Sequence, residues 1–192
     1  MLGFAAALRC LAVAGLLLGA SACAEPLSYD YAYLSHQKDH VDGQAFGNDT
    51  LGAYYQFGKN WHVFGSYGNA GSYGNPAWKD SRAARIGLGG HWLLGDDTMI
   101  AAEGALVRAQ FEKPSVGTVR DTGASAIFEI RHRFATWCEG IASASHSDVL
   151  GHHTDEFVAG PVFHLNRIFA VGAFYRRMEN SSGFEITART YY

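Results

Sequence analysis

The last ten residues of the chain, 183–192, constrain its fold more than any other segment, because they alternate between apolar and polar side chains. Phe184 and Ile186 lie on one face of this segment, and Glu185 and Arg189 lie on the other. Side chains alternate across a strand, so the pattern predicts a β-strand with one apolar face and one charged face. A strand at the end of a chain exposes an unpaired edge, so we expect another strand to pair with it.

The same two-residue alternation recurs along the chain. The first such segment places Leu27, Tyr29, Tyr31 and Tyr33 on one face. The expected strands lie at 27–36, 49–58, 61–69, 84–94, 99–111, 123–134, 137–146, 156–165, 168–178 and 183–192. Connections of two to four residues alternate with longer polar segments, and the short ones allow only antiparallel hairpins. The pattern predicts an all-β, antiparallel up-and-down barrel of about ten strands, with eight as the alternative.

The longer polar segments would form the outer loops. They lie at 37–48, 70–82, 112–122 and 147–154. Because loops carry most recognition surfaces, any contact with an extracellular ligand is expected there.

Residues 1–24 are expected to be a secretory signal peptide. Arg9 precedes a short apolar run at 11–19, and Ala22 and Ala24 form a small-residue cleavage site. The run is shorter than the roughly 20 apolar residues that an uncleaved membrane anchor needs. Lipidation at Cys23 is the other alternative, although the preceding residues lack the leucine of a lipoprotein signal. Residues 25–192 would then form a single domain.

The composition narrows the function classes. Removing Arg9 changes the formal net charge from −3 to −4, because residues 1–24 contain no acidic residue. This balance gives no basic surface for nucleic acid. Only Cys138 remains in the exported chain, so no internal disulfide can form. No apolar run of 18 residues follows the signal, so a membrane-embedded form would cross with strands.

Two architectures share the alternation. A soluble barrel directs its apolar face inward, whereas an outer-membrane barrel directs it towards lipid. Charged side chains within the strands and the long–short alternation of connections favour the membrane barrel. Aromatic residues also cluster beside short turns and at the chain end, as in an interfacial girdle: Trp61, Trp92, Trp137, Phe169 and Tyr192. We therefore expect Ile86, Phe128 and Ile186 to contact acyl chains.

These features resemble the small outer-membrane β-barrel proteins of Gram-negative bacteria, which include the OmpA-type membrane domain and OmpX. The resemblance rests on the signal peptide, the tyrosine-rich strands, the stretch from Trp61 to Tyr67 and the terminal Tyr192. It implies location in the outer membrane as a monomer surrounded by outer-membrane lipid. It also implies that the barrel assembly machinery reads Tyr192 as an assembly signal.

The charged face of the strands would line the lumen. It carries Arg85, Glu103, Glu129, Arg131, Arg133, Glu139, Arg176, Glu185 and Arg189. These groups can pair and plug the barrel, or they can line a narrow pore for small ions. Side chains just fill an eight-stranded barrel and ten strands leave slightly more space, which favours the plug.

Two further clusters suggest chemistry. A metal site could use the imidazoles and carboxylate of His146, His152, His153 and Asp155, although their spacing matches no tight ligand motif. Hydrolysis could use Ser145, His146, Ser147 and Asp148, but neighbours on a strand point to opposite faces. The sequence predicts no cofactor and no catalytic residue. The expected role is structural or surface contact through the outer loops, with a narrow channel or an outer-surface hydrolase as alternatives.

Overall fold

The computed structural model describes residues 27–41, 44–70, 79–113, 116–149, 151–179 and 181–192. The strands are β1 (Tyr31–Val41), β2 (Gln44–Phe57), β3 (Trp61–Ala70), β4 (Lys79–Leu93), β5 (Thr98–Lys113), β6 (Gly117–Ala135), β7 (Cys138–Val149), β8 (His152–His164), β9 (Phe169–Met178) and β10 (Ser181–Tyr191). No helix in these ranges has the length and apolar character needed to cross a bilayer.

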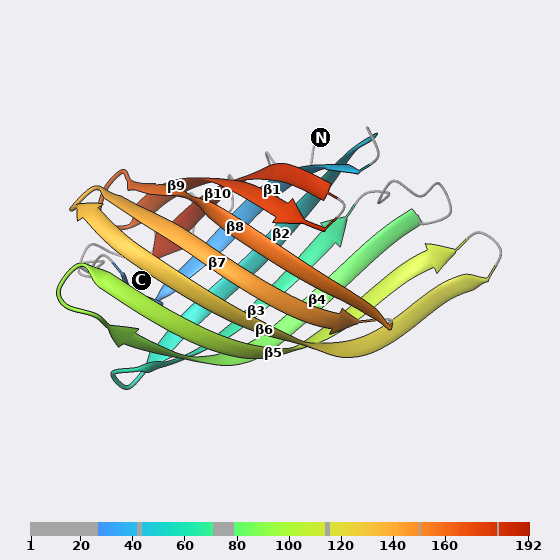
Figure 1. Cartoon of the computed structure of the whole chain (residues 1–192), viewed down its shortest axis with the longest axis horizontal. Coiled ribbons are helices and arrows are strands. Elements are labelled where there is room, and N and C mark those ends of the chain that lie inside the picture. Colours follow the sequence, from blue (N-terminus) through green and yellow to red (C-terminus); the bar gives the residue numbers. More distant parts are fainter. Residues whose placement is uncertain (1–26, 42–43, 71–78, 114–115, 150, 180) are drawn as a thin grey trace.

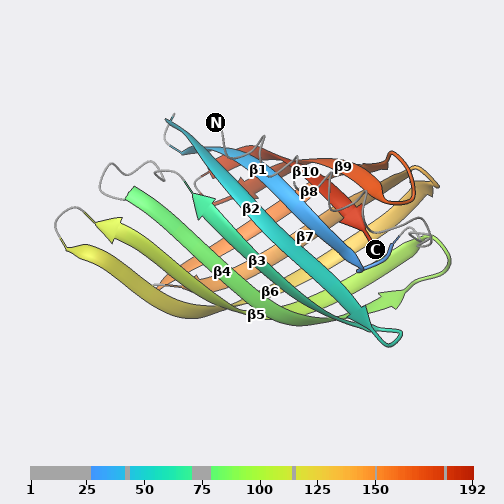
Figure 2. The same cartoon turned by 180° about the vertical axis from the view of Figure 1, so that it is seen from behind.

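The ten strands form one closed antiparallel barrel. Each strand pairs with its neighbours in sequence, and β1 pairs with β10 to close the sheet (Figures 1 and 2). The C-terminal strand therefore has partners on both sides, along β1 and along β9. The predicted fold class is confirmed, with ten strands rather than eight.

The two ends of the barrel differ in their connections. At one end, here called the turn end, short turns follow β2, β4, β6 and β8, and β10 finishes beside the start of β1. Two of these turns contain a glycine with positive φ, Gly58 at 67° and Gly95 at 81°. Glycine adopts this conformation without the steric penalty of a Cβ atom, which allows such tight reversals.

At the opposite end, here called the hairpin end, the strands are longer than the sequence indicated. Most of the segments expected as loops are continuations of paired strands. For example, β1 runs to Val41 and β2 begins at Gln44. The β5–β6 hairpin extends farthest, because β5 remains paired up to Lys113 and β6 begins at Gly117 (Figure 1, right). For 37–48, 112–122 and 147–154 the loop prediction was wrong, because a strand that is polar on both faces has no apolar alternation to distinguish it from a loop. Residues 42–43, 71–78, 114–115 and 150 lie outside the described residues.

The outer wall carries an apolar band. Ile86, Phe128 and Ile186 are 69%, 53% and 57% exposed, respectively. Polar residues take over at the outward positions near the hairpin end, where Arg108 follows Leu106 on β5. All strands have at least the roughly nine residues that a tilted transmembrane strand needs. An apolar surface this extensive requires a nonaqueous neighbour, as a lipid bilayer provides.

Strand β1 reverses the expected orientation. Tyr29, before β1, and Tyr31 are buried inside the barrel, and Tyr33 lines a cavity there. The apolar side of this segment therefore faces the lumen, whereas in β3–β6 and β8–β10 the apolar side faces outward. Tyrosine can face either environment because it combines a large apolar ring with a hydroxyl group that can form hydrogen bonds.

Candidate functional site in the barrel lumen

The lumen has two zones. The half near the turn end is packed with side chains, called here the lumen seal. Its members come from every strand except β9 and from the residues before β1: Tyr29, Tyr31, Tyr54, His62, His91, Met99, Glu103, Glu129, Arg131, Glu139, Val162, His164, Arg189 and Tyr191. Among the described residues, the six largest side chains that are less than 2% exposed all belong to this group: Tyr29, His62, Met99, Arg131, Glu139 and Val162.

One side of the lumen seal is an aromatic stack. The rings of Tyr29 and His62 lie 3.9 Å apart and within 4° of parallel. His62 Nε2 lies 2.9 Å from Glu103 Oε1, so the ring N–H donates to the carboxylate. The other ring nitrogen, Nδ1, lies 3.2 Å from Nδ1 of His91. A Cβ atom at Gly89 would overlap the His62 ring, so glycine leaves the space that the ring occupies.

Arg131 joins this stack to the opposite wall. Its guanidinium lies 4.2 Å from the centre of the Tyr29 ring. Arg131 Nε donates to Glu129 Oε1 at 2.6 Å, and Nη2 donates to the Tyr31 hydroxyl at 3.0 Å. The Tyr29 hydroxyl donates to the same Glu129 oxygen at 2.8 Å. This buried cation is therefore neutralised and hydrogen-bonded, which is the condition for stable burial of charge.

The contacts around Glu139 are looser. Glu139 Oε1 lies 3.7 Å from Arg189 Nη1 and 3.8 Å from His164 Nε2, beyond hydrogen-bonding distance. Both carboxylate oxygens, Arg189 Nε and Nη1, and the Tyr191 hydroxyl are buried without a hydrogen-bond partner. Unsatisfied buried polar atoms are costly, so this side of the lumen seal is its weaker part.

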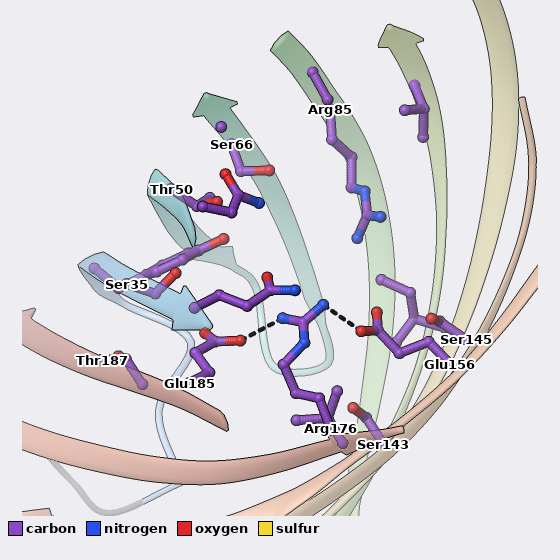
Figure 3. A pocket seen from close by; sticks show the side chains of 18 of the residues that line it. Ser35, Thr50, Ser66, Arg85, Ser143, Ser145, Glu156, Arg176, Glu185 and Thr187 are labelled. Atoms are coloured by element: carbon purple, nitrogen blue, oxygen red, sulfur yellow. Dashed lines mark hydrogen bonds and ion pairs between the residues drawn. The ribbon is translucent and has the colours of Figure 1, made fainter. Parts of the chain in front are cut away.

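The other half of the lumen holds a cavity of about 450 Å³, called here the vestibule. Most of the residues that line it have polar side chains, and Figure 3 shows side chains from several strands converging on it. The lining includes Ser35, Asn48, Thr50, Ser66, Arg85, Glu156, Arg176, Glu185, Thr187 and Arg189. The floor is formed by the residues that belong to both the cavity lining and the lumen seal: Tyr31, Tyr54, Glu103, Glu129 and Arg189.

Three charged residues form a bridge across the vestibule, called here the Arg176 bridge. Arg176 on β9 donates from Nη1 to Glu185 on β10 at 2.5 Å, and from Nη2 to Glu156 on β8 (Figure 3). Arg85 projects into the same cavity from β4. Among the residues that the structure describes, Arg85 forms no ion pair within 4 Å, so its charge is not neutralised by direct contact.

The structure places eight of the nine expected lumen charges in the lumen seal or on the vestibule wall. Arg133 lies apart from them. It forms an ion pair with Asp97 in the β4–β5 turn at 2.7 Å, with its side chain 28% exposed. Sequence reasoning missed Glu156 as a lumen residue, although this residue begins the expected strand 156–165. Its position two residues before Val158 on the inward side of β8 could have identified it.

The predicted metal residues lie on the β7–β8 hairpin. His146 Nδ1 lies 2.6 Å from Asp155 Oδ1, and the His146 and His153 rings stack at 5.8 Å. His153 is 3.7 Å from Asp148. Among the described side chains, which do not include that of His152, no three that could hold a metal ion lie together. Metal binding by this hairpin stays a prediction.

The residues considered for hydrolysis are separated by the wall of the barrel. Ser145 lines the vestibule, whereas its neighbours His146 and Asp148 are exposed on the outer side. The alternation of side chains across β7 accounts for this separation. These neighbours therefore do not assemble a serine–histidine–aspartate arrangement.

Comparison with known proteins finds relatives in fold only. No family model matches the sequence, and no curated protein matches it. Among solved structures, KdgM porin aligns with a TM-score of 0.52 at 7% identity, covering 83% of this chain and 99% of that chain. KdgM porin in complex with disordered oligogalacturonate gives 0.51 at 8% identity, with 84% and 99% covered. NanC porin gives 0.51 at 9% identity, with 83% and 99% covered.

Proposed function

We propose that this chain, an outer-membrane β-barrel protein, is a non-conducting barrel that binds a small solute in a vestibule open to the cell surface. In this arrangement the turn end faces the periplasm and the hairpin end faces outward, as short turns and long hairpins do in barrels of this kind. The lumen seal then separates the vestibule from the periplasm. The protein carries out no covalent chemistry and acts through binding and surface contact.

The lumen seal is the observation that carries this proposal. Arg131 and Glu139 are each 1% exposed, and Tyr29 and His62 are fully buried, although all four lie within the barrel. An open pore of this width would leave such side chains in contact with water. Arg131 on β6 forms hydrogen bonds with Glu129 on its own strand and with Tyr31 on β1, so the packing spans the lumen.

Planar-bilayer recording tests the proposal. The wild-type barrel, refolded from residues 25–192, is expected to give no stable single-channel steps. A barrel with Tyr29→Ala and His62→Ala is expected to conduct, because removing two stacked rings opens the centre of the lumen seal. Tyr55→Ala on the outer wall is the matched control, because Tyr55 is 57% exposed and lies outside the lumen. Stable steps from the wild-type barrel that change with Arg131→Ala would contradict a sealed lumen.

A narrow pore is the second candidate, and the unsatisfied polar atoms around Glu139 favour it. A rearrangement that admitted water would give hydrogen bonds to the Glu139 oxygens and to Arg189. Ions would then pass along β7, β8 and β10 rather than through the aromatic stack. In that case Glu139→Gln would alter wild-type conductance, whereas the Tyr29 and His62 substitutions would have little further effect.

The absence of catalysis is part of the proposal. The inward Ser145 and the outward His146 and Asp148 cannot act together on one substrate, because the barrel wall lies between them. An assay of the refolded barrel against ester, lipid and peptide substrates should show no turnover above the lipid-only control. Turnover lost on His146→Ala would instead indicate an outer-surface enzyme.

A further inference from the structure

Opposite charges lie on opposite walls of the vestibule and form no ion pair with each other. The Arg176 bridge contains one guanidinium and two carboxylates, so it carries an excess negative charge when both carboxylates are ionised. Arg85 contributes a positive charge from the opposite wall and makes no ion pair with Glu156 or Glu185 within 4 Å (Figure 3). The space between them is thus flanked by a positive and a negative group.

Two carboxylates on the floor are already engaged in hydrogen bonds, whereas Arg189 has only a longer contact. Glu129 accepts from Arg131, and Glu103 accepts from His62. Arg189 lies near Glu139 at 3.7 Å. Arg85 and the Arg176 bridge lie on opposite walls of the vestibule, so the charge separation between them is available to a ligand.

The lining also offers uncommitted polar atoms. Thr187 is 3% exposed, and its hydroxyl has no hydrogen-bond partner. Arg176 Nε is likewise buried without a partner. The hydroxyl groups of Ser35 and Thr50 face the same space (Figure 3). A buried polar atom gains most from a ligand that supplies its missing partner.

We infer that the vestibule binds a small zwitterionic solute, with its acidic group at Arg85 and its ammonium group at Glu156 and Glu185. A guanidinium matches the geometry of a carboxylate, and the carboxylates of the bridge accept hydrogen bonds from an ammonium group. The cavity of about 450 Å³ suits a small molecule. This inference rests on the proposed function, because it names the solute class of the same vestibule.

Isothermal titration calorimetry of the refolded barrel in detergent at pH 8 and low salt tests the inference. The probe is β-alanine, and the comparison ligands are propionate, which lacks the amine, and propylamine, which lacks the carboxylate. The wild-type barrel is expected to bind β-alanine at least about tenfold more tightly than either analogue, because each removes one charge-assisted contact. Propionate binding as tightly as β-alanine would overturn the inference, and so would the absence of β-alanine binding.

Substitutions locate the binding site. Arg85→Gln is expected to weaken β-alanine binding about tenfold or more, whereas Arg85→Lys retains part of it because the charge remains. Glu156→Gln should weaken β-alanine binding in the same way, because it removes a carboxylate that would accept from the ammonium group. Arg177→Gln is the matched control, since Arg177 lies on the outer side of β9 and should leave binding unchanged. Equal binding by wild type and Arg85→Gln, both folded by heat-modifiable gel migration, would refute the site.

The two proposals fail separately. A barrel that conducts ions in planar bilayers refutes the sealed lumen, whatever its binding titration shows. A non-conducting barrel that binds no β-alanine keeps the sealed lumen and refutes only the zwitterionic ligand.

Discussion

Replacing Arg131 by methionine should destabilise the barrel far more than the same change two residues along the strand. Arg131 is 1% exposed and forms an ion pair with Glu129, whose side chain is 15% exposed. Removing one partner of a buried pair leaves the other charge uncompensated and costs about 3–5 kcal/mol. Glu129 keeps its hydrogen bond from Tyr29, so we expect the lower end, about 3 kcal/mol.

Arg133→Met is the matched control. Arg133 has the same side chain on the same strand, but its partner Asp97 is 56% exposed in a turn. Exposed pairs contribute at most about 1 kcal/mol, so the two substitutions should differ by about 2 kcal/mol or more. A double variant with Arg131→Met and Glu129→Gln should recover part of the loss, because it no longer buries a lone carboxylate.

Reversible urea unfolding of the barrel in lipid vesicles, followed by tryptophan fluorescence and by gel migration of unboiled samples, measures these differences. The reasoning is refuted if Arg131→Met loses no more free energy of unfolding than Arg133→Met. It is also refuted if Glu129→Gln added to Arg131→Met lowers stability further. Either result would mean that the charges of the lumen seal are hydrated rather than paired.

Three further predictions concern packing, orientation and assembly. Gly89→Ala should cost about 1–3 kcal/mol by overpacking the His62 ring, whereas Gly104→Ala, with nothing within 4 Å of its new Cβ, should be nearly neutral in the same unfolding assay. Ile86→Arg should cost about 2–4 kcal/mol if this position lies near the bilayer midplane, and no loss in vesicles would place it in water. Deleting Tyr192 should slow assembly in cells, as followed by the fraction of folded barrel on unboiled gels, and unchanged kinetics would remove its assembly role.

The sequence was sufficient for the architecture because a two-residue period is a direct consequence of strand geometry. The outward positions of Ile86, Phe128 and Ile186 follow from it, and so does the inward position of Glu103. The period defines two faces of each strand, however, and does not indicate which face lines the lumen and which contacts lipid. In β4–β6 and β8–β10 the charged side chains decide the question.

In β1 that criterion fails. Tyr31 faces the lumen because its hydroxyl accepts from Arg131, a contact between residues 100 positions apart. No local pattern contains such a partner. The pairing of Arg176 with both Glu156 and Glu185 escaped prediction for the same reason, since it depends on the order of β8, β9 and β10 around the barrel. The sequence identified the charged residues of the lumen. Their partners depend on which strands are neighbours and in which register, and the sequence alone does not give this.

The pairing of β1 with β10 runs along the whole of β1, from Tyr31 to Val41. The backbone donors and acceptors on this edge of β1 therefore stay unpaired until β10 has been synthesised. Until then both strands are open edges on which another polypeptide could add. A protein truncated anywhere before residue 181 would retain such an edge permanently, and we expect it to aggregate or to be degraded rather than to persist as a smaller barrel.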